Sequence, residues 1–161
     1  APQGAGLVML TNGTNGKHAM KHLQCLWRHS IGVSSDLDSC ARPIGVTVLL
    51  VAVREGADAA IARYRHLKLT RSRDWVFDDT QLINPGYALL RRGRLDEAIS
   101  LFKLNVEEYP ESANAYDSLG EALSKSGNRK GALSNYERAL KLDPTNDHAA
   151  KALAELRSAP R

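Results

Sequence analysis

Residues 114–146 read NAYDSLGEALSKSGNRKGALSNYERALKLDPTN, and this stretch decides the fold because its pattern also occurs one step earlier in the chain. Six positions repeat: Gly86, Gly93, Ala98, Phe102, Val106 and Pro110 return as Gly120, Gly127, Ala132, Tyr136, Leu140 and Pro144. Each pair is 34 residues apart, a period typical of solenoids built from pairs of helices. The spacing therefore predicts a mainly α fold, a helix-turn-helix solenoid in which neighbouring helical pairs stack on one another.

Each repeated position has a physical reason. Gly120 allows a second helix to approach closely, and Gly127 ends the first helix where a side chain would be strained. Ala132 is small for the same close approach, and Tyr136 fills the groove between the two helices. Pro144 stops the second helix because it has no N–H to donate. We therefore expect one complete helical pair here.

This string resembles the tetratricopeptide repeat family almost throughout. The preceding copy, Asp79–Pro110, departs from the family pattern at two positions: Pro85 replaces the usual leucine and Asn105 the usual alanine. Because proline is tolerated near the start of a helix, we expect Asn84 to be the N-cap and Pro85 the first residue of a short helix.

A further helix is predicted after the second copy. Residues Asn146–Arg157 carry Ala149, Leu153 and Leu156 on one face, which is typical of the helix that caps a solenoid. We therefore predict that residues 79–161 form a C-terminal unit of two tetratricopeptide-like repeats and a capping helix.

The resemblance implies a protein or peptide partner, bound on the inner face of the repeats. The candidate binding residues are Tyr87, Asn114, Asp117, Glu121 and Lys125, which carry no dominant charge. Some members of the family hold a C-terminal carboxylate with a lysine and an asparagine of the first inner helix. Ile83 and Tyr87 occupy those positions here, which argues against a ligand of that kind.

Residues 43–78 allow two interpretations. The β-branched run Val46–Val53 is compatible with a strand, but "LLVAVREGADAAIARYRHL" parallels "ALLRRGRLDEAISLFKLNV" in the first repeat. We therefore favour a degenerate helical pair, with Val46–Val53 and Ala57–Leu67 on either side of Gly56.

Residues 1–42 are predicted to hold a strand, Gly6–Leu10, an Asn-Gly turn, a helix over Lys17–Ser30 and a polar linker. Met20, Leu23, Trp27 and Ile31 share one face of that helix. An isolated apolar strand exposes unpaired backbone groups, so we expect self-association through this strand. The chain begins without a methionine, and we expect its start to be a cut rather than a natural terminus.

"GLVMLTNGTNG" followed by a helix resembles the last strand and C-terminal helix of the serine β-lactamase and penicillin-binding-protein-like hydrolases. The resemblance implies a bacterial parent, periplasmic or secreted, of which residues 1–42 would be a strand-helix remnant. The catalytic motifs of that family, such as Ser-x-x-Lys before a helix, do not occur in this sequence. No catalytic residue can therefore be assigned.

The predicted helix Lys17–Ser30 also places His18, His22, Cys25 and His29 along one stripe. Imidazoles four residues apart can chelate one divalent ion, and a thiolate one turn further can add a ligand. Zinc is the expected metal if this stripe is a site. No general base accompanies the pair, because Ala19, Met20 and Lys21 separate His18 from His22.

Length, charge and composition limit which partners and surroundings the chain can have. The chain has 161 residues, a net charge of +4 and two cysteines, and its longest apolar run, Ile44–Val53, is too short to cross a bilayer. The basic run 63–73 lacks interleaved aromatic residues apart from Tyr64, so nucleic acid is not the expected partner. The leading hypothesis is a protein-interaction scaffold without a cofactor, the non-catalytic C-terminal part of a hydrolase-like protein. The alternative is a small zinc-binding, hydrolytic protein that uses the histidine stripe.

Overall fold

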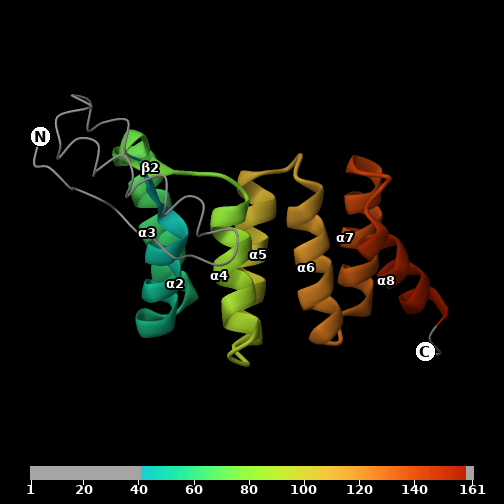
Figure 1. The fold of residues 1–161 in the computed structure, drawn as a ribbon. Helices are drawn as coiled ribbons and strands as arrows, with labels where there is room; N and C mark the ends of the chain where they lie inside the picture. Colours follow the sequence, from blue (N-terminus) through green and yellow to red (C-terminus); the bar gives the residue numbers. More distant parts are fainter. Residues whose placement is uncertain (1–40, 159–161) are drawn as a thin grey trace, which may run out of the picture.

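A computed structural model of the chain describes residues 41–158 (Figure 1). The elements in chain order are β1 (Arg42–Pro43), α2 (Ile44–Glu55), α3 (Ala57–Thr70), the 3-10 helix η1 (Ser72–Asp74), β2 (Trp75–Val76), α4 (Thr80–Leu90), α5 (Leu95–Glu108), α6 (Ala113–Lys125), α7 (Arg129–Leu142) and α8 (Asp147–Ser158).

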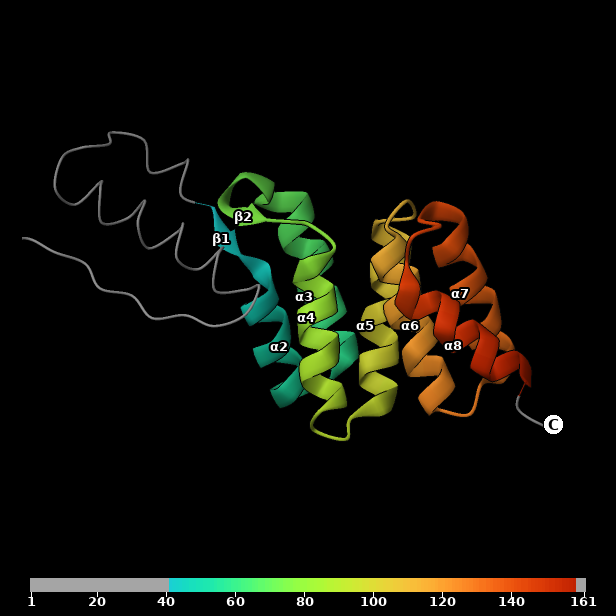
Figure 2. The ribbon, with the colours of Figure 1, turned by 45° about the vertical axis from the view of Figure 1, so that its right-hand side comes forward.

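The helices of this range stack in pairs, α2 with α3, α4 with α5 and α6 with α7. Helices α2, α4 and α6 follow one another across the front of the molecule in Figure 1, and α8 ends the stack. The view turned by 45° brings α8 forward, where it lies against α6 and α7 (Figure 2). The predicted fold class, a mainly α solenoid of helical pairs, is confirmed.

Two glycines explain how closely the helices of a pair approach. A Cβ on Gly86 would lie 2.4 Å from Phe102 Cε1, and a Cβ on Gly120 would lie 3.0 Å from Tyr136 Cδ1. Both aromatic rings are buried, so the glycine of the first helix and the ring of the second form one contact in each pair. Glycine also ends α6, because Gly127 has a φ of 79° that a larger residue rarely adopts.

The beginning of α4 contradicts the prediction from sequence. The N-cap is Asp79 rather than Asn84, and Pro85 lies inside the helix instead of at its first position. Proline removes one backbone donor at this point. The helix nevertheless continues, because Pro85, Leu82 and Leu89 are all fully buried. Tertiary packing therefore overrides the local cost of the proline.

Residues 44–70 form the helical hairpin that the sequence favours over a strand. Pro43 offers no side-chain cap to α2, and the Gly45 N–H instead donates to Gln81 Oε1 of α4 at 3.1 Å. The short strands β1 and β2 pair in parallel, and the Arg42 guanidinium lies 4.3 Å from the centre of the Trp75 ring. The strand pair thus joins the two ends of the hairpin segment, and the Gly45–Gln81 hydrogen bond links the hairpin to the first repeat.

Several predictions concern residues outside the described range, including the strand Gly6–Leu10, the helix Lys17–Ser30 and self-association through the strand. They stay predictions, as do the three proposed units 1–42, 43–78 and 79–161. Among residues 41–158, every helix is too short or too polar to cross a membrane.

Candidate peptide-binding face

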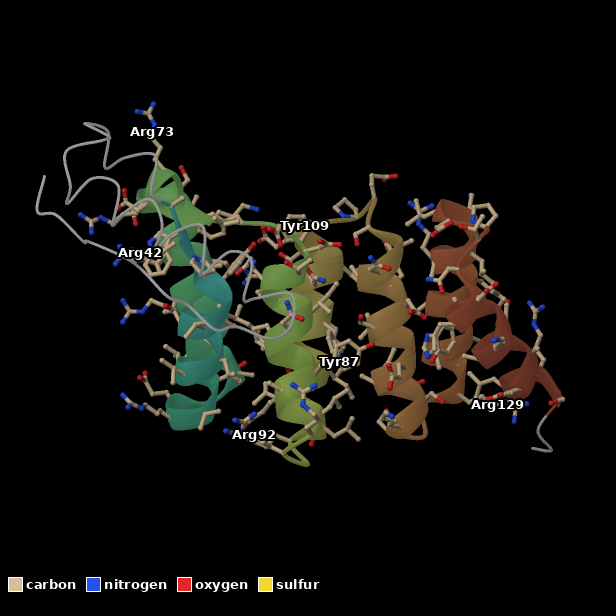
Figure 3. The ribbon with its side chains drawn as sticks, viewed as in Figure 1. Arg42, Arg73, Tyr87, Arg92, Tyr109 and Arg129 are labelled. Atoms are coloured by element: carbon tan, nitrogen blue, oxygen red, sulfur yellow. The ribbon has the colours of Figure 1, made fainter. Side chains whose placement is uncertain are left out.

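The inner face is the side of the stack that α2, α4 and α6 form (Figure 1). The 34-residue period places Tyr87 of α4 and Glu121 of α6 at equivalent positions on it. In Figure 3 the Tyr87 side chain lies between α4 and α6. This is therefore the part of the face where neighbouring repeats can act on one ligand.

A hydrogen-bonded chain crosses from one repeat to the next. The Tyr87 hydroxyl donates to Glu121 Oε2 at 2.8 Å, and Lys125 Nζ lies 3.0 Å from Glu121 Oε1. The Tyr87 ring packs edge-on against Phe102, with 5.3 Å between the ring centres. Tyr87 is thus held at both ends, its ring by the core of the first repeat and its hydroxyl by the second.

The protonation states follow from these contacts. Burial raises the pKa of Tyr87 well above its ordinary value, and Glu121 raises it further, so the phenol remains a donor. Burial also acts to raise the pKa of Glu121, but hydrogen bonds from Tyr87 and Lys125 outweigh it and leave the pKa below its ordinary value. Glu121 is therefore a carboxylate at neutral pH.

An open cavity of about 460 Å³ lies beside this chain of contacts. The lining residues come from α4, from the turn and the start of α5, and from α6; they are Tyr87, Leu90, Arg91, Gly93, Leu95, Glu121 and Lys125. Its chemistry combines apolar side chains with two basic groups, Arg91 and Lys125, and one carboxylate.

The structure brings three of the five candidate binding residues together at this cavity, namely Tyr87, Glu121 and Lys125. Asp117 instead faces α8, where its carboxylate lies 2.8 Å from His148 Nδ1. Asn114 is exposed near the beginning of α6 and does not line the cavity. Sequence reasoning missed Leu90, Arg91 and Leu95. The repeat period offered a signal for Arg91, because it stands 34 residues before Lys125.

The candidate metal ligands His18, His22, Cys25 and His29 lie outside the described residues. Within residues 41–158, His, Cys, Asp and Glu side chains do not gather in a group of three or more that could hold a metal ion. The zinc hypothesis stays a prediction about the front of the chain.

Comparison with known proteins supports the repeat interpretation. Residues 113–146, which span α6, α7 and the following turn, match the family model of the tetratricopeptide repeat. The match covers the second repeat of the solenoid. No curated protein matches the chain. The resemblance of residues 4–31 to serine hydrolases gains no support and stays a prediction.

Several solved structures are similar to the chain in fold. One is the first tetratricopeptide-repeat domain of Spaghetti (RPAP3), bound to the HSP90 peptide SRMEEVD. It is 19% identical to this chain in sequence, with a TM-score of 0.51, and the match covers 86% of this chain and 92% of that chain. The second domain of human RPAP3, in complex with the HSP70 peptide SGPTIEEVD, is 14% identical with a TM-score of 0.51, over 91% and 100%. The Sgt2 domain from Aspergillus fumigatus is 19% identical with a TM-score of 0.50, over 73% and 79%.

Proposed function

We propose that this chain is a protein-interaction scaffold that binds a peptide segment of a partner on its inner face, between α4 and α6. The observation that carries the proposal is the cavity beside Tyr87, Glu121 and Lys125. Its volume of about 460 Å³ lies within the range of ordinary ligand pockets. Two domains of similar fold are bound to chaperone peptides, which supports a peptide as the class of ligand.

The lining of the cavity indicates what the peptide contains. Leu90, Leu95 and the Tyr87 ring offer an apolar surface to one side chain of the partner. Arg91 is exposed at the edge of the cavity, and half-exposed Lys125 is already paired with Glu121. An acidic residue next to the apolar anchor would meet Arg91. The preferred ligand is therefore an apolar side chain flanked by a carboxylate.

The carboxylate belongs to a side chain rather than to a chain end in this proposal. Ile83 and Tyr87 occupy the positions where some family members hold a C-terminal carboxylate with lysine and asparagine. Ile83 cannot donate a hydrogen bond, and the Tyr87 hydroxyl is engaged by Glu121.

Selection from a random peptide library on the full chain tests this function. We expect the selected peptides to share an apolar residue beside an acidic one, and to bind Arg91→Glu about tenfold or more weakly, because the reversal places like charges together. Lys103→Glu is the matched control, since Lys103 is exposed on α5, away from the cavity. Peptides that bind Arg91→Glu and the wild type equally well would refute the proposed site.

A further inference from the structure

Helix α2 differs from the other inner helices because large apolar side chains lie on its exposed side as well as on its buried side. Ile44, Val48 and Ala52 are fully buried against the hairpin and α4. On the opposite side, Val46, Leu50 and Val53 are 48%, 53% and 41% exposed. These three residues are separated by four and three positions and form one stripe along the helix, which we call the α2 stripe.

The later repeats show what a solvated inner face looks like. Gly56, Gly93 and Gly127 all have a positive φ and follow the first helix of their pairs. Leu50, Tyr87 and Glu121 stand at the same distance before these glycines and are therefore equivalent positions. The inner face of α6 carries Asp117 and Glu121, both of which make polar contacts. The α2 stripe has no polar residue. A contiguous exposed apolar stripe of this kind normally marks a surface that another apolar surface covers.

We propose that residues 17–31 of this same chain cover the α2 stripe. This inference goes beyond peptide binding at the α4–α6 cavity, because the stripe lies on α2 and lines none of that cavity. The amphipathic pattern of the segment supplies the partner surface: Met20, Leu23, Trp27 and Ile31 are separated by three, four and four positions and share one face of a helix.

The length of the connecting chain permits this packing. Residues 32–41 join the segment to β1, and ten extended residues span about 33 Å. The twelve residues of α2 span about 18 Å, at 1.5 Å per residue. The segment can therefore turn back and lie along the whole of α2.

Connectivity also favours this segment over a second copy of the chain. A short linker gives a tethered segment an effective concentration in the millimolar range, so docking within one chain precedes association at micromolar protein. The side chains proposed to meet are apolar in the segment and in the α2 stripe, which would provide the driving force.

Fluorine NMR on the full chain labelled with fluorotryptophan tests the proposal. The chain contains two tryptophans, Trp27 and Trp75, and Trp27→Phe assigns the two resonances. We expect the Trp27 resonance to lie away from its position in denatured protein and to show reduced solvent accessibility. The Trp75 resonance reports independently whether the described fold is intact.

The decisive variant is Leu50→Asp, which places a charge in the centre of the stripe. We expect its docking equilibrium to fall roughly thirtyfold, equivalent to about 2 kcal/mol at 1.4 kcal/mol per tenfold. The Trp27 resonance should then move to the denatured position while the Trp75 resonance stays in place. Leu69→Asp is the matched control, because Leu69 is an exposed leucine on α3, 86% accessible and outside the stripe.

Three outcomes would overturn the proposal. The first is an exposed Trp27 in the wild-type chain. The second is a protected Trp27 that does not respond to Leu50→Asp. The third is protection that grows with protein concentration between about 10 and 300 micromolar, well below the effective concentration of a tethered segment, since that would assign the stripe to a second copy.

Discussion

Gly86 and Gly120 stand at equivalent positions of the two repeats, yet the space beside them differs. A Cβ on Gly86 would come within 2.4 Å of the buried Phe102 ring, whereas a Cβ on Gly120 would lie 3.0 Å from Tyr136. Alanine favours a helix over glycine by about 1 kcal/mol, which opposes the clash in both cases. The balance between the two effects therefore differs between the repeats.

We expect Gly86→Ala to lower the free energy of unfolding by about 1–3 kcal/mol, because the Phe102 ring is fully buried and must shift. Gly120→Ala should change it by less, since a displacement of a few tenths of an ångström suffices there. Urea unfolding followed by circular dichroism measures both. Equal losses of stability in the two variants would contradict the prediction, because they would show that the distance from the added Cβ to the aromatic ring does not determine the free energy of unfolding.

Asn105 is the second departure of the first repeat from the family pattern, and it carries a cost. Its side chain is fully buried on α5, and neither Oδ1 nor Nδ2 has a hydrogen-bond partner in the structure. A buried amide without partners costs about 1–3 kcal/mol. Asn105→Leu keeps the branched shape and removes both polar atoms.

Asn105→Leu is therefore expected to raise the free energy of unfolding by about 1–2 kcal/mol. Asn105→Asp provides the contrast, because a buried charge should lower stability instead. Thermal and urea unfolding distinguish the two signs. A loss of stability in Asn105→Leu would mean that the amide has a bonding partner in solution.

A hydrogen bond from the Tyr87 hydroxyl to Glu121 joins helices α4 and α6. The pKa of Glu121 lies below its ordinary value despite the effect of burial. Ionised Glu121 therefore contributes stability above the ordinary pKa of a glutamate, and this contribution is lost as the pH falls through the lowered pKa.

Tyr87→Phe should raise the pKa of Glu121 and reduce the free energy of unfolding at neutral pH by about 1 kcal/mol. The difference from the wild type should shrink in acid, where Glu121 is protonated in both proteins. Urea unfolding across the acidic range measures this difference. Tyr116→Phe serves as the control, because it also removes one tyrosine hydroxyl. The ring that contacts Arg138 is kept in that variant. A pH-independent effect of Tyr87→Phe would assign it to packing alone.

The sequence could predict those elements whose contacts lie within one repeat. Gly120, Tyr136 and Gly127 contact or shape their own helical pair, so the period alone located α6 and α7. Pro85 could not be placed in the same way, because what tolerates it is burial contributed by neighbouring helices. The strand-like run Val46–Val53 is a helix for a similar reason, since Ile44, Val48 and Ala52 find an apolar surface on α3 and α4.

The cavity on the inner face was only partly predictable on the same grounds. Tyr87, Glu121 and Lys125 follow from the positions that point inward in a helical pair. Leu95 lines the cavity because the turn after α4 brings the start of α5 beside α6. That placement depends on the arrangement of two repeats in space, which a pattern within one repeat does not contain.

Among residues 41–158, each helical pair packs mainly against its neighbours in the stack, so the ends of the stack should open before its centre. Helix α8 packs against α7 and α6, and its buried side chains are Ala149 and Leu153. Leu101 of α5, by contrast, is fully buried in the centre of the stack. The two leucines therefore belong to units of different stability.

We expect Leu153→Ala to weaken the docking of α8 by about 2–3 kcal/mol and to speed amide hydrogen exchange in α8, while α4 to α7 keep their protection. Leu101→Ala should instead reduce protection throughout α4 to α7, because it removes a fully buried side chain from the middle of the stack. Native-state hydrogen exchange by mass spectrometry resolves the two patterns. If Leu153→Ala lowered protection equally in every helix, the stack would unfold as one cooperative unit, and the nearest-neighbour description of this solenoid would be wrong.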